Sequence, residues 1–186
     1  PLTSAFLLLK DVKDDSIFVE LIKNEIFTNK NLNTNISLNV KNITNIDELN
    51  SLFLNTNIQE GKISLSDSNI MWKDDLKIEL LESLLLYDEN QINLVGKVVL
   101  QFINIDDFYK SFQIKKNARK KINQIQIDFN YNFDKKKISF DNIKIDNVPN
   151  LEVQKFVDKF NLNNKKIMNK IIFKNFVSSF FIAYAG

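Results

Sequence analysis

The sequence predicts a mostly β protein with added helices: a curled antiparallel sheet, open as a groove or half-barrel, followed by two C-terminal amphipathic helices. Residues 122–147 alternate apolar and polar side chains, which is the period of half-buried strands. The same period begins at Asn35, in the segment NISLNVKNI. Helical spacing of apolar residues dominates only after the strands. We therefore expect a sheet over 35–147, a short helical insertion at about 106–121, and a helical pair over 150–186.

Residues 1–34 are ambiguous, because a short apolar run is followed by helix-like spacing at Ile17, Leu21 and Ile22. They predict either a helix or edge strands. The apolar run is much shorter than the roughly 20 residues needed to span a bilayer. The chain starts with Pro1 and no secretory signal follows. We interpret it as a fragment or processed product, so that any targeting segment would lie upstream.

One strand of the predicted sheet is apolar on both sides. Leu94 and Val98 share one parity, while Val95 and Val99 share the other. A strand of this kind is typical of a position covered on both faces, whereas the flanking strands show one-sided alternation.

The alternation changes phase in the last predicted strand. Ile138 and Phe140 stand at even positions, whereas Ile143 and Ile145 stand at odd positions. A regular strand would send the two pairs to opposite faces. One inserted residue restores a common face, so we predict a β-bulge at Asp141–Asn142.

The helices are predicted from apolar spacing and from capping residues. Phe108 and Phe112 stand at i and i+4, after Asp106 and Asp107 as candidate caps. The last twelve residues carry no charge but are too few to span a membrane, which favours a buried or interfacial helix. The predicted stripes contain Val153, Phe156, Val157 and Phe160 in the first C-terminal helix, and Ile167, Ile171, Phe176 and Phe180 in the second.

The composition removes most catalytic chemistry. The chain has no cysteine and no histidine, which excludes Cys/His zinc sites and Ser-His or Cys-His nucleophile pairs. Only three glycines occur, and no phosphate-binding glycine loop can be built from them. The net charge of +2 does not indicate a nucleic-acid partner. We expect no enzymatic activity, no metal and no cofactor.

The charged motifs have ordinary structural interpretations. The aspartate pairs at 14–15, 74–75 and 106–107 are typical of solvated turns or helix caps. The segment KKNARKK at 115–121 is the densest basic cluster, and it fits either a solvated helix end or contact with phospholipid headgroups. The candidate headgroup contacts are Lys115, Lys116, Arg119, Lys120 and Lys121.

The apolar face of the sheet is the stronger functional candidate. Each of its residues alone is more simply explained as core. Together they form a face that two short helices do not fully cover, and large uncovered apolar patches mark binding of lipid, partner or membrane. The candidate groove residues are Ile36, Leu38, Val40, Ile63, Leu65, Leu94, Val98, Leu100, Ile125, Ile127, Phe129, Tyr131, Phe133, Ile138 and Phe140.

The stretch from Gly61 to Asp146, with the strand ending in Trp72 and the DDFYKSFQI break followed by basic residues, resembles the C-terminal region of AsmA-like proteins (AsmA/TamB type) from AT-rich marine alphaproteobacteria. The closing KNFVSSFFIAYAG resembles their final helix. The resemblance covers about two thirds of the chain and carries no catalytic motif. It implies a periplasmic module, anchored in the inner membrane by a segment absent here.

The same resemblance implies a function. An AsmA-like module would hold or conduct phospholipid acyl chains along a hydrophobic groove, in phospholipid transport and outer-membrane assembly, and its C-terminal helices would contact a membrane. The alternative is a non-enzymatic structural or protein-interaction α+β domain with a closed core. Helices that cover the whole sheet face would favour this alternative.

Overall fold

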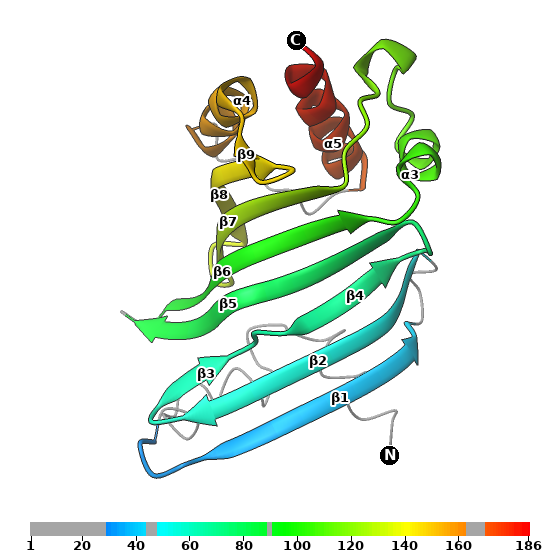
Figure 1. The fold of residues 1–186 in the computed structure, drawn as a ribbon. Coiled ribbons are helices and arrows are strands. Elements are labelled where there is room, and N and C mark those ends of the chain that lie inside the picture. Colours follow the sequence, from blue (N-terminus) through cyan, green and yellow to red (C-terminus); the bar gives the residue numbers. More distant parts are fainter. Residues whose placement is uncertain (1–28, 44–47, 89–90, 163–169) are drawn as a thin grey trace.

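The computed structural model describes residues 29–43, 48–88, 91–162 and 170–186, so most of the ambiguous segment 1–34 lies outside it. The predicted fold is confirmed: nine antiparallel strands form one open sheet with a short helix and two C-terminal helices (Figure 1). The strands are β1 (Thr34–Asn42), β2 (Leu49–Gln59), β3 (Lys62–Ser64), β4 (Ser68–Trp72), β5 (Leu76–Asp88), β6 (Gln91–Phe102), β7 (Gln124–Asn132), β8 (Lys137–Ile145) and β9 (Val148–Pro149). The helices are α3 (Ile105–Ser111), the 3₁₀ turn η1 (Lys116–Ala118), α4 (Leu151–Leu162) and α5 (Lys170–Ala185).

The strands follow one another across the sheet almost in sequence order, β1-β2-β3-β5-β6-β7-β8-β9. Strand β4 also lies between β2 and β5, so β3 and β4 are two parts of one interrupted strand. Serine hydroxyls replace backbone groups at the interruption. The Ser66 Oγ accepts the Ser83 N–H at 3.0 Å, and the Ser68 Oγ accepts the Asn55 N–H at 2.9 Å. These bonds satisfy backbone donors that a continuous strand would otherwise pair.

Strand register places the apolar residues on one side, because directly paired residues point to the same face of a sheet. We call this side the apolar face. The opposite side, the polar face, carries amide and charged side chains in most strands, but β5 and β6 also place apolar residues there: Leu81, Leu84, Leu86, Val95 and the buried Val99. One row of the apolar face crosses the sheet from β8 to β1 through Ile138, Tyr131, Leu94, Leu85, Ile63, Ile58 and Thr34.

The predicted β-bulge in β8 is confirmed. Asp141 pairs with Asp128 and Lys144 pairs with Gln126, so two residues of β8 face one residue of β7. The extra residue is Asn142, whose φ of 47° lies in the left-handed region that Asn tolerates. The bulge brings the buried Ile143 and Ile145 onto the same face as Phe140.

A second bulge lies in β5 and was not predicted. Leu81 pairs with Lys97 and Leu84 pairs with Val95, so Glu82 and Ser83 together face Gly96. Ser83 is fully buried, and its Cα approaches Gly96 so closely that an added Cβ would lie 2.6 Å from it. Gly96 therefore permits the close approach of two backbones at this point.

The main core lies between the apolar face and the three helices. Aromatic rings dominate it: Phe108 of α3 stands 4.5 Å from Phe112, and Tyr109 stands 5.0 Å from Phe181 of α5, centroid to centroid. Val153 and Val157 of α4 pack into the same cluster and are almost fully buried. The predicted stripe of the first C-terminal helix is confirmed by these residues.

The stripe predicted for α5 needs correction. Ile167 lies outside the described residues, and Ile171 is 69% exposed rather than packed. The other two residues of the predicted stripe are confirmed, because Phe176 stands 4.7 Å from Phe160 of α4 and Phe180 is buried. None of the helices in the described ranges has the length and hydropathy needed to cross a membrane.

Helix α3 ends earlier than the predicted insertion at about 106–121. Gln113 adopts a φ of 55°, its N–H donates to the Lys110 carbonyl, and the Ile114 N–H donates to the Tyr109 carbonyl. These two bonds form a Schellman motif, which terminates a helix and which usually has Gly at the left-handed position.

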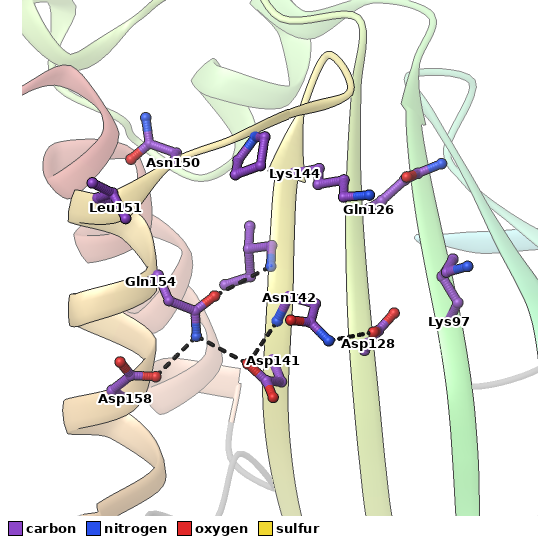
Figure 2. A pocket seen from close by; sticks show the side chains of 12 residues that line it. Lys97, Gln126, Asp128, Asp141, Asn142, Lys144, Asn150, Leu151, Gln154 and Asp158 are labelled. Carbon is purple, nitrogen blue, oxygen red and sulfur yellow. Dashed lines mark hydrogen bonds between the residues drawn. The ribbon is translucent and has the colours of Figure 1, made fainter.

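The last long strand has its outer edge covered by α4. The Asn161 side chain accepts the Phe140 N–H at 3.1 Å and donates to the Phe140 carbonyl at 2.6 Å. The Gln154 Oε1 accepts the Ile143 N–H at 3.2 Å (Figure 2). These amides take the place of a neighbouring strand, which is one of the ways proteins protect a sheet edge.

Candidate functional site

The helices cover one part of the apolar face. Of the fifteen candidate groove residues, five lie in this covered part, where they are buried or pack against the main core. Their neighbours are the aromatic residues of α3 and α5 and the apolar side of α4. A lipid could reach them only after displacing the helices. The five are Val98, Leu100, Ile125, Ile127 and Phe140.

A second, smaller cluster lies on the apolar face away from the helices. Its buried members are Ile58, Ile63, Leu85 and Ile92, with Phe133 packed against them. The candidates Ile63, Leu94 and Phe133 belong here, but the sequence did not single out Ile58, Leu85 or Ile92. Leu85 was not predicted from the sequence because it stands in a run of three leucines that shows no alternation.

Where β1 and β2 pair, five residues of the apolar face belong to neither buried cluster, and we call them the β1–β2 strip: Ile36, Leu38, Val40, Leu52 and Leu54. Leu38 pairs with Leu54 and Val40 pairs with Leu52, so these side chains share the apolar face. Ile36 is 51% exposed, and the other four are half-buried. Ile36, Leu38 and Val40 were predicted groove residues. Leu52 and Leu54 were missed, although their equal parity was the available signal.

The remaining candidates lie between these regions. Leu65 stands in the interruption between β3 and β4, where its N–H donates to the Ser83 carbonyl at 2.8 Å. Phe129 pairs with Gly96, and Ile138 pairs with Tyr131. Burial raises the pKa of the Tyr131 phenol.

The basic segment 115–121 lies beside the C-terminal part of α5, at the other end of the sheet from β1 (Figure 1). The Arg119 Nε donates to the Ile114 carbonyl, and the Lys120 carbonyl accepts the Tyr109 hydroxyl at 2.6 Å. Burial raises the pKa of Tyr109 to about 12. Lys115, Lys116, Lys120 and Lys121 are exposed. The structure therefore does not bring the headgroup candidates to the β1–β2 strip.

The aspartate pairs differ from each other. Asp14 and Asp15 lie outside the described residues. The N-cap of α3 is Asn104, whose side chain accepts the Asp107 N–H at 3.3 Å, so the predicted caps Asp106 and Asp107 lie in the first turn instead. A hydrogen bond from Lys110 lowers the pKa of Asp107. Asp75 is buried rather than solvated, and this desolvation raises the pKa of its carboxyl.

A polar cavity of about 560 Å³ lies on the opposite side of the sheet, between β6–β8 and the start of α4 (Figure 2). Its side chains bind one another: Asn142 donates to Asp128 at 2.9 Å, and the Gln154 amide donates to both Asp141 and Asp158. These hydrogen bonds between the lining side chains hold α4 beside the bulge in β8. Within the described ranges no three metal-ligating side chains stand close enough together to hold a metal ion.

Comparison of the chain with protein-family models, with curated proteins and with solved structures found no match.

Proposed function

We propose that this chain binds the acyl chains of lipids on the β1–β2 strip, as part of a periplasmic lipid-binding or lipid-conducting module of the AsmA-like type. The observation that supports this is the strip itself: five apolar side chains on one face, outside both buried clusters, with Ile36 half-exposed. The resemblance of Gly61–Asp146 to AsmA-like proteins supplies the role in phospholipid transport and outer-membrane assembly.

The dimensions of the strip suit an acyl chain. Ile36 and Val40 are four residues apart on a strand, a distance of about 14 Å. Half of a bilayer's hydrocarbon core is about 15 Å thick, so one lipid tail matches this length. Burial of a methylene group is worth about 0.8 kcal/mol, and roughly six buried methylenes would gain about 5 kcal/mol. Such binding needs no polar site, which agrees with the scattered charges of the sequence.

The strip also continues into the rest of the apolar face. Thr34 of β1 pairs with Ile58, which begins the row that crosses the sheet to Ile138. A lipid bound on β1 and β2 would therefore lie beside the second buried cluster rather than on an isolated patch. The basic segment 115–121 lies too far from the strip to hold the headgroup of the same lipid, so lysines there would contact a second molecule.

A structural or protein-interaction role is the second candidate, and the main core favours it. Three helices already close the apolar face over β6, β7 and β8, with Ile125 and Val153 almost fully inaccessible to solvent. This is the closed α+β arrangement over that part of the sheet. The two candidates therefore differ only over the β1–β2 strip.

The test is uptake of a fluorescent fatty acid, together with mass spectrometry of lipids that co-purify with the intact chain. The variant carries Leu38→Ser and Val40→Ser, which remove apolar area from the strip. The matched control is Leu86→Ser, because Leu86 is 41% exposed but lies on the polar face of β5. We expect the double variant to weaken uptake at least tenfold and the control to leave it unchanged.

Two outcomes would contradict acyl-chain binding. If the wild-type chain carries no co-purified lipid and takes up no fluorescent fatty acid, acyl-chain binding is excluded and the structural or protein-interaction role is the candidate that stays. If Leu86→Ser loses as much fatty-acid uptake as the double variant, the fatty acid does not bind specifically on the β1–β2 strip. Circular dichroism of each variant verifies that the fold is retained.

A further inference from the structure

Strand β1 lies at an edge of the sheet, and β2 is its only strand partner among the described residues (Figure 1). The Asn55 N–H of β2 donates to the Ser68 Oγ at 2.9 Å, and the Asn55 carbonyl accepts the Ser68 hydroxyl at 3.2 Å. Both backbone groups of Asn55 therefore point towards β4 and away from the β1 partner of Asn55, Ser37. Directly opposed residues in an antiparallel pair exchange both hydrogen bonds or neither, so the Ser37 N–H and carbonyl point away from β2.

The same orientation extends along β1. The register between β1 and β2 is unbroken from Thr34 to Val40, and hydrogen-bonded and non-hydrogen-bonded pairs alternate along an antiparallel ladder. Asn35 and Asn39 therefore also direct their backbone groups outward, whereas the even-numbered residues bond to β2. The outer edge of β1 is thus a row of backbone donors and acceptors that a further strand can pair with.

This edge lacks the features by which proteins usually protect a strand edge, which are charged residues, proline, a bulge or a covering helix. From Thr34 to Val40 the strand contains no charged residue and no proline, and its register shows no bulge. The β8 edge differs in each respect, because it carries charged residues, contains a bulge and is covered by the amides of α4. The contrast indicates that the β1 edge has a strand as its partner.

The sequence of β1 is complementary to itself in antiparallel orientation. When two copies of TNISLNVKN overlap along their full length, Leu38 lies opposite the Leu38 of the second copy, on the two-fold axis. Ile36, which is 51% exposed in the single chain, then lies opposite Val40. The only charged residue of the strand, Lys41, lies opposite the neutral Asn35. Like charges are not opposed, and apolar residues meet apolar residues on one face.

The outward backbone groups fit the same register. Ser37 lies opposite Asn39 of the second copy, and both residues have outward N–H and carbonyl groups, so they exchange two hydrogen bonds. The Leu38 pair on the axis is then a non-hydrogen-bonded pair, in which side chains approach most closely. Full overlap of the two strands provides about eight backbone hydrogen bonds.

We propose that two copies of this chain associate by antiparallel pairing of β1 with β1, in the register centred on Leu38. The interface is isologous, with the same edge used by both copies, and it joins two sheets by strand addition. A strand contact of nine residues is about 30 Å long and one strand wide, which is smaller than a standard protein interface. The dimer is therefore reversible. It uses the backbone of the edge and does not depend on acyl-chain binding.

The first experiment is sedimentation equilibrium of the intact chain over a range of concentrations. The weight-average mass of the wild type should rise from that of one chain towards that of two. Asn39→Pro removes an outward N–H that β2 does not use, and proline is tolerated at such an edge position. This variant should weaken dimerisation at least about tenfold, because each copy loses a hydrogen bond at the interface. The matched control, Asn39→Ala, keeps the N–H and should dimerise like the wild type.

The second experiment tests the register by disulfide cross-linking, for which the chain is suited because it has no cysteine. In the proposed dimer the two Leu38 Cα atoms are about 4.5 Å apart, within the range that a disulfide spans. Leu38→Cys should therefore form a covalent dimer under mild oxidation. Ile36→Cys should not, because the two positions 36 are about 14 Å apart. A mixture of Ile36→Cys and Val40→Cys chains should form the mixed dimer.

Three results would overturn the proposal. These are a wild type that stays monomeric at every concentration, an equal loss of dimer in Asn39→Ala and Asn39→Pro, and cross-linking of Ile36→Cys as fast as that of Leu38→Cys. The first would mean that the β1 edge takes another partner or none. Fatty-acid uptake by Asn39→Pro, whose β1–β2 strip is unchanged, should equal that of the wild type, so failure of either proposal is visible without the other.

Discussion

Gly96→Ala tests the close contact between the β5 bulge and β6. A Cβ at position 96 would lie 2.3 Å from the Ser83 Oγ, 2.6 Å from its Cα and 2.8 Å from its Cβ, whereas ordinary contacts are 3.4–4 Å. The Oγ can rotate away, but the Cα belongs to the backbone. The two strands would have to separate locally by about 0.8 Å, the difference between 2.6 and 3.4 Å. Overpacking of this kind typically costs 1–3 kcal/mol, and we expect about 2–3 kcal/mol of unfolding free energy to be lost.

The assay is urea unfolding followed by the fluorescence of Trp72, the single tryptophan, whose ring stands 5.5 Å from that of Phe112. Ser83→Gly in the Gly96→Ala background should restore part of the loss, because it removes two of the three contacts and leaves the Cα. The reasoning fails if Gly96→Ala unfolds within about 0.5 kcal/mol of the wild type, or if the double variant shows no coupling.

Three further changes test other contacts. Asn161→Ala removes both bonds to the Phe140 backbone and should cost about 2 kcal/mol, with new self-association in sedimentation velocity if the β8 edge is freed. Tyr109→Phe leaves the Lys120 carbonyl unpaired and should cost about 1–2 kcal/mol in urea unfolding. Because burial raises the Tyr109 pKa from 10.0 to about 12, the wild type should also lose stability as pH rises between these values, and the variant should lose less. Asp75→Asn should raise the free energy of unfolding more at pH 7 than at pH 3. Burial raises the pKa of the Asp75 carboxyl, so the folded state disfavours the charged form that is present at pH 7. An equal gain at both pH values would contradict this.

The strands and their apolar face could be predicted because a period of two is a local property of the sequence. Ile36, Leu38 and Val40 share a parity and share a face, and the change of parity between Phe140 and Ile143 located a bulge. Each of these inferences needed only neighbouring residues.

The β5 bulge could not be predicted, because the strand around Glu82 is apolar at both parities and gives no phase to follow. Helix α3 ends at Ser111 because Gln113 adopts a left-handed conformation usually given to Gly, so the sequence carried no stop signal there. The exposure of Ile171 was missed because the helical period alone does not show which turn of α5 lies beyond its partner helix.

Neighbouring residues in the sequence also could not predict which candidate groove residues the helices cover and which lie on the β1–β2 strip. Ile127 and Leu38 both stand in segments of one-sided alternation, yet Ile127 lies in the main core and Leu38 lies on the β1–β2 strip. Their difference comes from where three helices dock, which depends on contacts between residues far apart in the chain. Sequence pattern identified the face, and only tertiary packing shows which part of it stays accessible.

The two edges of this sheet differ, because side-chain amides of α4 cover the β8 edge. On the β8 side, Asn161 and Gln154 already occupy backbone positions that another strand would need. On the β1 side, β2 is the only strand partner among the described residues. A further strand, from any source, would therefore pair with β1, next to Ile36, Leu38 and Val40. It would extend the apolar surface on which we propose that the lipid binds.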